Sequence, residues 1–312
     1  MFDQKFITEA ITRSAETPTD RRNFLHAAKL TGIGIGAAAL VAATSNAAQA
    51  STTPTAAAAL SDATILNFAL NLEYLEAEFY LHAVTGYGLT DKLTTGTGKR
   101  GPVEGGHAVP FKSHRLRQIA TEIASDEKDH VAFLRTALGS AAVSRPSINI
   151  GDSFTAAALA AGLIKKGQKF DVYANENNFL LGAFIFEDVG VTAYKGAAPL
   201  ITNKTYLGAA AGILAVEAYH AGIIRTKLLD KGLSAPTVNI SNLRNAVDGP
   251  SNDDQPIVVH GVANLVPTDA NGLAFGRTPG RVLNIAYLTP ATVTKGGFFP
   301  AGVNGALNTS GA

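Results

Sequence analysis

The segment from Leu116 to Ala137 constrains the fold more than any other part of the chain. Its seam positions recur at steps of four and three residues, which is typical of the inward face of a bundle helix. These positions are Leu116, Ala120, Ile123, Glu127, His130, Leu134 and Ala137. A buried carboxylate beside a buried imidazole is costly unless something binds both. The segment therefore predicts a bundle helix with a ligand site on its inner face.

The same pattern returns once, between Tyr206 and Leu228. Glu217 and His220 lie at the centre of this second seam, again three residues apart. Residues at i and i+3 are neighbours on one helix face, so both side chains of each pair can reach one centre. Two helices of the bundle are therefore each expected to supply one carboxylate and one imidazole.

Two further apolar helical stretches each carry a single glutamate on the seam. Glu73 is followed by Tyr80, and Glu187 is followed by Tyr194. The order along the chain is then Glu, Glu-x-x-His, Glu, Glu-x-x-His. This order predicts a doubled two-helix unit that closes into a four-helix bundle around two metal ions.

The predicted ligand set contains four carboxylates and two imidazoles. Its members are Glu73, Glu127, His130, Glu187, Glu217 and His220. Four carboxylates neutralise two divalent cations, and hard oxygen ligands with two imidazoles favour Fe or Mn. We expect Glu127 and Glu217 to bridge the metals, Glu73 and Glu187 to be terminal ligands, and each metal to take one imidazole.

Neighbouring residues are candidates for supporting roles. Asp126 is a candidate acceptor for a ligand imidazole, whereas the second Glu-x-x-His helix has Val216 at the equivalent place. Tyr80 and Tyr194 are the candidate catalytic residues, either as hydrogen-bond donors to the ligand carboxylates or as electron carriers.

Two other glutamates follow Glu73 on the same helix. Glu76 also falls on a seam that can be drawn through this stretch, so its orientation stays open, and Glu78 is expected to face outward.

The predicted fold is an all-α core, a ferritin-like four-helix bundle over residues 61–232 with long loops. Its helices are expected at about 62–84, 112–139, 173–196 and 203–231, with a short helix in the crossover at 153–164.

Residues 233–312 are expected to form an irregular, partly β extension packed on the bundle, because their apolar content is thin for a separate core. Short strands such as Ile257–Val259, one helix near Pro279–Leu288 and an anchor at Gly296–Pro300 are expected there. No catalytic motif is recognisable in this extension.

Residues 1–50 are interpreted as a targeting segment, followed by a linker at 51–60. Arg21 and Arg22 lie in a stretch that resembles the twin-arginine export motif, an apolar run follows, and Ala48–Ala50 offers a cleavage site. We therefore expect a periplasmic or secreted protein with no stable membrane span after cleavage; the alternative is an anchor retained through the apolar run.

Charge and cysteine content exclude several classes of protein. The net charge is +1, and residues 1–50 hold one more basic than acidic side chain, so the remainder has no formal net charge. This gives no electrostatic basis for binding nucleic acid. The absence of cysteine excludes disulfides, thiolate metal sites and cysteine nucleophiles.

The chain resembles the ferritin-like domain family that includes the plant desiccation-related proteins. The likeness covers about residues 61–306 and is carried by Leu66–Tyr80, the two Glu-x-x-His pairs, Asp269–Pro279 and Gly296–Gly305. A narrower likeness to bacterioferritin and rubrerythrin rests on the ligand order and on Glu73 with Tyr80 and His82. The resemblance implies a ferritin-like bundle and a dinuclear metal centre without settling an activity.

Two hypotheses on function follow. The first is an oxidoreductase whose dinuclear Fe or Mn site reacts with a small-molecule oxidant, either peroxide or dioxygen, with ferroxidase-like iron oxidation as a variant. The second is a stress-protective structural protein in which the metal only stabilises the bundle. A storage shell is disfavoured by the long loops and tail, and a homo-oligomer stays open.

Overall fold

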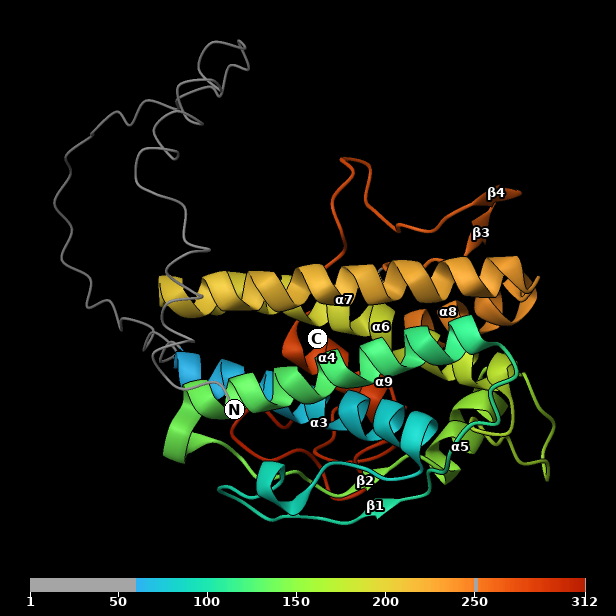
Figure 1. Cartoon of the computed structure of the whole chain (residues 1–312). Helices are drawn as coiled ribbons and strands as arrows, with labels where there is room; N and C mark the ends of the chain where they lie inside the picture. The colour runs from blue at the N-terminus through green and yellow to red at the C-terminus, as the bar shows by residue number, and fades with distance from the viewer. Residues whose placement is uncertain (1–59, 250–251, 312) are drawn as a thin grey trace, which may run out of the picture. The chain divides into compact units, whose positions relative to one another are not determined.

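A computed structural model describes residues 60–249 and 252–311 of the chain (Figure 1). The twin-arginine motif, the cleavage site and all of the linker but Leu60 fall outside the described residues, so these expectations stay predictions. Within the described part the structure is mostly helical, as the sequence predicts.

Four long helices form the bundle: α3 (Asp62–Thr85), α4 (His114–Leu138), α6 (Glu176–Ala197) and α7 (Lys204–Asp230). Each begins after a polar residue whose side chain accepts hydrogen bonds from the first backbone N–H groups: Ser61, Ser113, Asn175 and Asn203. These N-caps explain why the helices begin within a few residues of the expected positions. The helix α3 packs along α4, and α6 packs along α7 (Figure 1).

Short elements connect and cover the bundle. The strand β1 (Val103–Glu104) pairs in parallel with β2 (Ile148–Asn149), and α5 (Asp152–Ala160) follows within the crossover to α6. In the extension, β3 (Val258–Val259) pairs antiparallel with β4 (Val262–Ala263), and α9 (Pro279–Ala286) occupies the predicted helical position.

One helix of the extension was not expected. The helix α8 (Ser234–Val247) lies where the sequence predicts irregular structure, because Gly232 and Pro236 are typical of the end of a helix. Proline is tolerated in the first turn of a helix, where its missing N–H has no intrahelical partner to lose. Pro236 occupies such a position in α8, two residues after its first residue Ser234.

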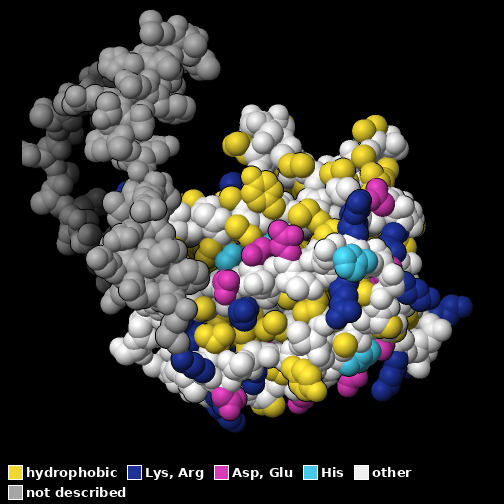
Figure 2. All heavy atoms as spheres, in the orientation of Figure 1, with side chains coloured by type: hydrophobic (Ala, Val, Ile, Leu, Met, Phe, Trp, Pro, Cys, Tyr) yellow, Lys and Arg dark blue, Asp and Glu magenta, His cyan; other side chains and the backbone are white. Residues whose placement is uncertain are grey.

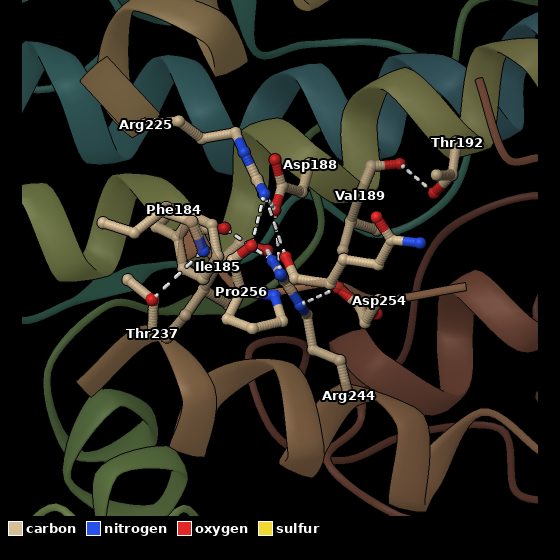
Figure 3. A network of polar contacts seen from close by, with 12 residues as sticks. Phe184, Ile185, Asp188, Val189, Thr192, Arg225, Thr237, Arg244, Asp254 and Pro256 are labelled. Carbon is tan, nitrogen blue, oxygen red and sulfur yellow. Dashed lines mark hydrogen bonds and ion pairs between the residues drawn. The ribbon is translucent and has the colours of Figure 1, made fainter. Parts of the chain in front are cut away.

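A buried cluster of arginine and aspartate side chains joins the extension to the bundle (Figure 3). Asp188 on α6 pairs with Arg225 on α7 at 2.7 Å and with Arg244 on α8 at 2.9 Å. Arg244 and Arg277 also pair with Asp254. We call this set, completed by the pair between Arg277 and Asp248, the Arg–Asp cluster.

The predicted anchor near the end of the chain is confirmed by its burial. Phe298 and Phe299 have no exposed surface, and the ring of Phe298 lies 5.0 Å from the rings of Phe154 and Phe186. The last segment is therefore fixed against α5 and α6 by aromatic packing.

The helix α7 is long and apolar enough to cross a membrane by length and composition alone. Its Glu217 and His220 are buried toward the other bundle helices, although only 33% of its apolar window is buried. On the face shown in Figure 2, basic and acidic side chains are scattered among hydrophobic and neutral ones.

Candidate metal centre

All six predicted ligands lie together between the four bundle helices. Two groups of side chains have ligand atoms within 4.8 Å of one another: Glu73, Glu127, His130 and Glu217 in the first, and Glu127, Glu187 and His220 in the second. Glu127 belongs to both groups. The spacing of three residues in each Glu-x-x-His pair places both side chains on the inner face of one helix, which is why the two pairs converge.

The first group is organised around the imidazole of His130. Its Nδ1 atom lies 3.2 Å from Glu73 Oε2, 3.4 Å from Glu127 Oε2 and 3.8 Å from Glu217 Oε1. Three carboxylates from α3, α4 and α7 thus face one ring nitrogen. This arrangement offers a single cation several oxygen ligands and one nitrogen ligand.

The second group is organised around His220. Its Nδ1 atom lies 3.0 Å from Glu127 Oε1 and 3.5 Å from Glu187 Oε2. The rings of His130 and His220 have centroids 6.5 Å apart, so the two groups adjoin on either side of Glu127. The two oxygens of Glu127 therefore face different imidazoles.

Several buried ligand atoms have no hydrogen-bond partner among the described residues. They are both carboxylate oxygens of Glu127 and of Glu217, Glu187 Oε2 and His220 Nδ1. Buried polar atoms are rarely left without partners, since each costs about 1–3 kcal/mol. Their convergence on one place is the pattern that bound cations would satisfy.

The two seam tyrosines donate hydrogen bonds across the bundle. Tyr80 on α3 donates to Glu187 Oε1 on α6, and Tyr194 on α6 donates to Glu73 Oε1 on α3. Each tyrosine thereby binds the lone glutamate of the opposite helix pair. One oxygen of each lone glutamate is held in place, and the other faces a histidine.

Asp126 contacts the imidazole of a predicted ligand, and only one of the two Glu-x-x-His helices provides such a contact. Its Oδ2 atom lies 3.1 Å from His220 Nε2, which leaves Nδ1 directed at Glu127 and Glu187. An acceptor at the outer ring nitrogen fixes the tautomer that a metal needs. No equivalent carboxylate contact comes from Val216, the residue before Glu217, because its side chain is apolar.

Burial and mutual repulsion raise the pKa values of most site carboxyls. Burial raises the pKa of Glu73 to about 7, although the charge on His130 opposes this rise. Burial and the charge on Glu127 raise the pKa of Glu217 well above its ordinary value. The pKa of Glu187 is also raised by burial. Without cations, several of these groups therefore hold protons near neutral pH.

The pKa shifts of Glu127 and of the two imidazoles favour the charged forms of these groups. Burial alone would raise the pKa of Glu127, but the nearby imidazoles of His130 and His220 hold it below its ordinary value. Burial opposes charge on the imidazoles, yet Glu73 raises the pKa of His130 to about 11, and Glu187 raises that of His220 to about 12. The metal-free site is thus compensated by protonated histidines.

The glutamates Glu76 and Glu78 are both buried. Glu76 has 5% of its surface exposed, and burial together with the charge on Glu127 raises its pKa well above the ordinary value. The sequence left its orientation open, and the structure directs it toward the site. The prediction that Glu78 faces outward is wrong: it is fully buried and pairs with Arg145 at 2.5 Å, because the loop after α3 covers that side of the helix.

Gly190 on α6 provides space for the carboxylates. A Cβ atom at this position would lie 2.2 Å from Glu217 Oε2 and 3.4 Å from Glu76 Oε1. Glycine inside a helix costs about 1 kcal/mol relative to alanine, so its presence here has a packing reason. The sequence alone does not reveal this, because the neighbour of Gly190 belongs to a different helix.

The residues present fit a pair of divalent cations. Four carboxylates and two imidazoles match the donor set of dinuclear carboxylate sites in bundles. Two such cations would replace the protons on the histidines and on the carboxyls of raised pKa, and would satisfy the unpartnered atoms. The identity of the metal does not follow from this donor set.

Comparisons with known proteins agree with this fold and site. Residues 61–230 match the ferritin-like domain. The desiccation-related protein PCC13-62 of Craterostigma plantagineum is 31% identical over 264 residues, which cover 78% of this chain and 83% of that protein. The ferritin-like catalase Nec2 of Nesocodon mauritianus is 27% identical over 265 residues, which cover 79% and 84% of the two chains. No solved structure matches the chain.

The family match spans more than half of the chain and contains all six predicted ligands. The match to the desiccation-related protein extends over most of both sequences. The protein therefore belongs to the ferritin-like domain family, which includes desiccation-related proteins.

Proposed function

We propose that this protein removes hydrogen peroxide at a dinuclear Fe or Mn centre. The observation that carries the proposal is the convergence of unpartnered buried ligand atoms around Glu127. One relative, which is 27% identical, is named a ferritin-like catalase, and this name supports a reaction with peroxide. Disproportionation of two peroxide molecules yields two water molecules and one dioxygen, so no external reductant is needed.

In this proposal Glu127 and Glu217 would be shared between the two metals, and Glu73 and Glu187 would each hold one of them. His130 would hold one metal and His220 the other. The centre would supply two-electron redox chemistry when bound. The asymmetric grouping, with Glu217 close to His130, suggests that the two metal positions differ.

The chain's own residues hold this arrangement in place. Tyr80 and Tyr194 each hold one oxygen of a lone glutamate through a hydrogen bond, which leaves the second oxygen for a metal. Asp126 holds the Nε2 proton of His220, so Nδ1 stays directed at the centre. Burial excludes bulk water from the carboxylates and strengthens their interaction with cations.

The test is metal analysis combined with a peroxide assay. The purified protein should hold about two Fe or Mn ions per chain and should evolve dioxygen from hydrogen peroxide. The double variant Glu127→Ala, His220→Ala should lose both the metal and the activity. The control Glu122→Ala changes an exposed carboxylate on the same helix and should change neither. Full metal content in the double variant would contradict the proposed centre.

A structural role is the second candidate, because one relative is named as desiccation-related. In that case the cations would only neutralise the buried carboxylates. Chelation would then lower the melting temperature strongly, and the metal-loaded protein would consume no peroxide, dioxygen or Fe(II). The dioxygen-evolution assay on metal-loaded protein therefore separates the two candidates.

A further inference from the structure

A small apolar cavity lies beside Glu76 and Gly190, and its lining residues include none from α4 or α7, the two helices that carry His130 and His220. It lies between α3, α6 and α9 and has a volume of about 30 Å³. A volume of about 10–15 Å³ on this scale already holds one water molecule, so the cavity has room for a molecule of two to four atoms. Its walls include Leu75, Phe186 and Val282, and the one ionisable side chain among its lining residues is Glu76.

The cavity reaches the carboxylates through Gly190, which is also one of its wall residues. A Cβ atom on Gly190 would lie within 3.4 Å of both Glu217 Oε2 and Glu76 Oε1. Because Gly190 has no side chain, this residue places no atoms beyond its backbone between the cavity and these carboxylates. Glu76 consequently borders the cavity and the metal centre at once.

The outer wall of the cavity belongs to the C-terminal extension. Val282, Ile285 and Ala286 of α9 line it together with Phe298. On the bundle side, Leu72 lies one turn before Glu76 on α3 and is the lining residue at which the proposed route would meet solvent, because its side chain is only partly buried. Apolar walls disfavour ions and large polar molecules, whose desolvation is most costly, and a small uncharged polar molecule enters at lower cost where a group such as Glu76 offers it a hydrogen bond.

We propose that this cavity is the chamber through which hydrogen peroxide reaches the metal centre, with Glu76 as its polar anchor. The inference rests on the proposed function and names the substrate route for it. A carboxyl oxygen of Glu76 accepts a hydrogen bond from the peroxide O–H at the inner end. The extension thereby acts as the wall that selects small uncharged oxidants.

The route is tested by filling the cavity from the extension. Ala286→Leu enlarges a wall residue, and Ala291→Leu makes the same change at an exposed position nearby as the control. The probe is nitric oxide, a small uncharged molecule that binds Fe(II), added to Fe(II)-loaded protein in a stopped-flow absorbance experiment. Ala286→Leu should slow nitric oxide association about tenfold or more at unchanged iron content, by analogy with other gated sites. Ala291→Leu should match the wild type.

A second measurement does not need the metal. Crystals of the wild-type protein under xenon pressure should show xenon beside Glu76, and crystals of Ala286→Leu should not, because apolar cavities of this kind take up xenon. An unchanged association rate for nitric oxide in Ala286→Leu, or a wild-type cavity without xenon, would overturn the proposal. If xenon binds in the wild type and Ala286→Leu slows nitric oxide association, but the wild type evolves no dioxygen from peroxide, the proposed function fails while the route stands.

The role of Glu76 is tested by comparing Glu76→Gln with Glu76→Leu. Glutamine keeps a hydrogen-bond acceptor of the same length, and leucine removes it. The KM for peroxide should rise about tenfold in Glu76→Leu and less in Glu76→Gln, with nitric oxide association unchanged in both. Equal KM values in the two variants and the wild type would remove Glu76 from the proposal.

Discussion

Two buried clusters of charged side chains within residues 60–249 and 252–311 are compensated in different ways. In the Arg–Asp cluster, Asp188 and Asp254 pair with the arginines Arg225, Arg244 and Arg277. In the metal centre, the carboxylates face only two imidazoles, and several of their oxygens have no partner among the described residues. The first cluster carries its own arginine cations, whereas the second has only two protonated imidazoles and could hold cations from outside.

This difference distinguishes carboxylates that the chain itself pairs with cations from carboxylates that it leaves available to a ligand. A buried ion pair is stable when geometry and further hydrogen bonds compensate desolvation. Arg225 meets this condition, because its guanidinium also donates to the carbonyl oxygens of Gln255, Pro256 and Asn264. The metal centre does not meet it without cations, and the raised pKa of Glu73 reflects that deficit.

The largest expected effect comes from a substitution that breaks the Arg–Asp cluster. Asp254→Ala should lower the free energy of unfolding by about 3–5 kcal/mol, because Arg244 and Arg277 then stay buried with one partner fewer. The loss should be the same with and without chelator, as measured by urea denaturation. The control Asp230→Ala breaks an exposed pair with Lys227 and should cost about 1 kcal/mol or less. A loss that disappears on metal removal would show that the two clusters are not independent.

The next effect is the pH dependence of the metal-free protein. The pKa of Glu73 rises from 4.5 to about 7 on folding, and those of His130 and His220 rise from 6.5 to about 11 and about 12. The folded state therefore binds more protons than the unfolded state between pH 5 and pH 8, so its stability must fall as the pH rises. We expect a loss of about 2–3 kcal/mol over this range, from the Glu73 shift alone.

Metal should reverse this trend. Cations compete with protons for the same ligands, so metal affinity rises with pH. In the presence of excess Mn(II), thermal denaturation should therefore show higher stability at pH 8 than at pH 5. A metal-free protein that gains stability from pH 5 to pH 8 would contradict the assigned directions of the pKa shifts.

The smallest expected effect concerns the hydrogen bonds behind the ligands. Tyr80→Phe removes the donor to Glu187 and should lower metal affinity about tenfold, and Asp126→Asn should act similarly through His220. The metal-free protein should lose only about 1–2 kcal/mol of stability in Tyr80→Phe. Isothermal titration with Mn(II) measures the affinity. Tyr206→Phe, on the part of α7 before the ligands, is a matched control that should leave it unchanged.

Much of the bundle could be predicted because its signals are local. Seam periodicity around Glu127 and Glu217, and the cap at Ser61, are each contained within a single helix. A contact between Asp126 and a ligand imidazole was also predictable, since only one of the two Glu-x-x-His helices has an acid before its glutamate, but the sequence does not show that this imidazole belongs to His220 on the other helix. The burial of the ligands follows from the same periodicity.

The remainder depends on contacts between distant segments. The partners Asp188, Arg225 and Asp254 lie on separate elements, and no periodic pattern joins them. The burial of Glu78 depends on a loop that folds back over α3, and the space beside Gly190 depends on a side chain from α7. The helix α8 was missed because Pro236 is both a helix terminator and a residue tolerated in a first turn.

The crossed tyrosine bonds have a consequence for a damaged or partly unfolded chain. Tyr80 of the α3–α4 pair donates to Glu187 of the α6–α7 pair, and Tyr194 of the α6–α7 pair donates to Glu73 of the α3–α4 pair. Once the two helix pairs separate, both glutamates therefore lose the hydrogen bonds that hold them in place. Release of the cations and loss of tertiary structure should then happen in one step. If the proposed centre holds Fe or Mn, a chain awaiting degradation would not carry that ion with it, and the folding state of the protein would then limit where the ion can react.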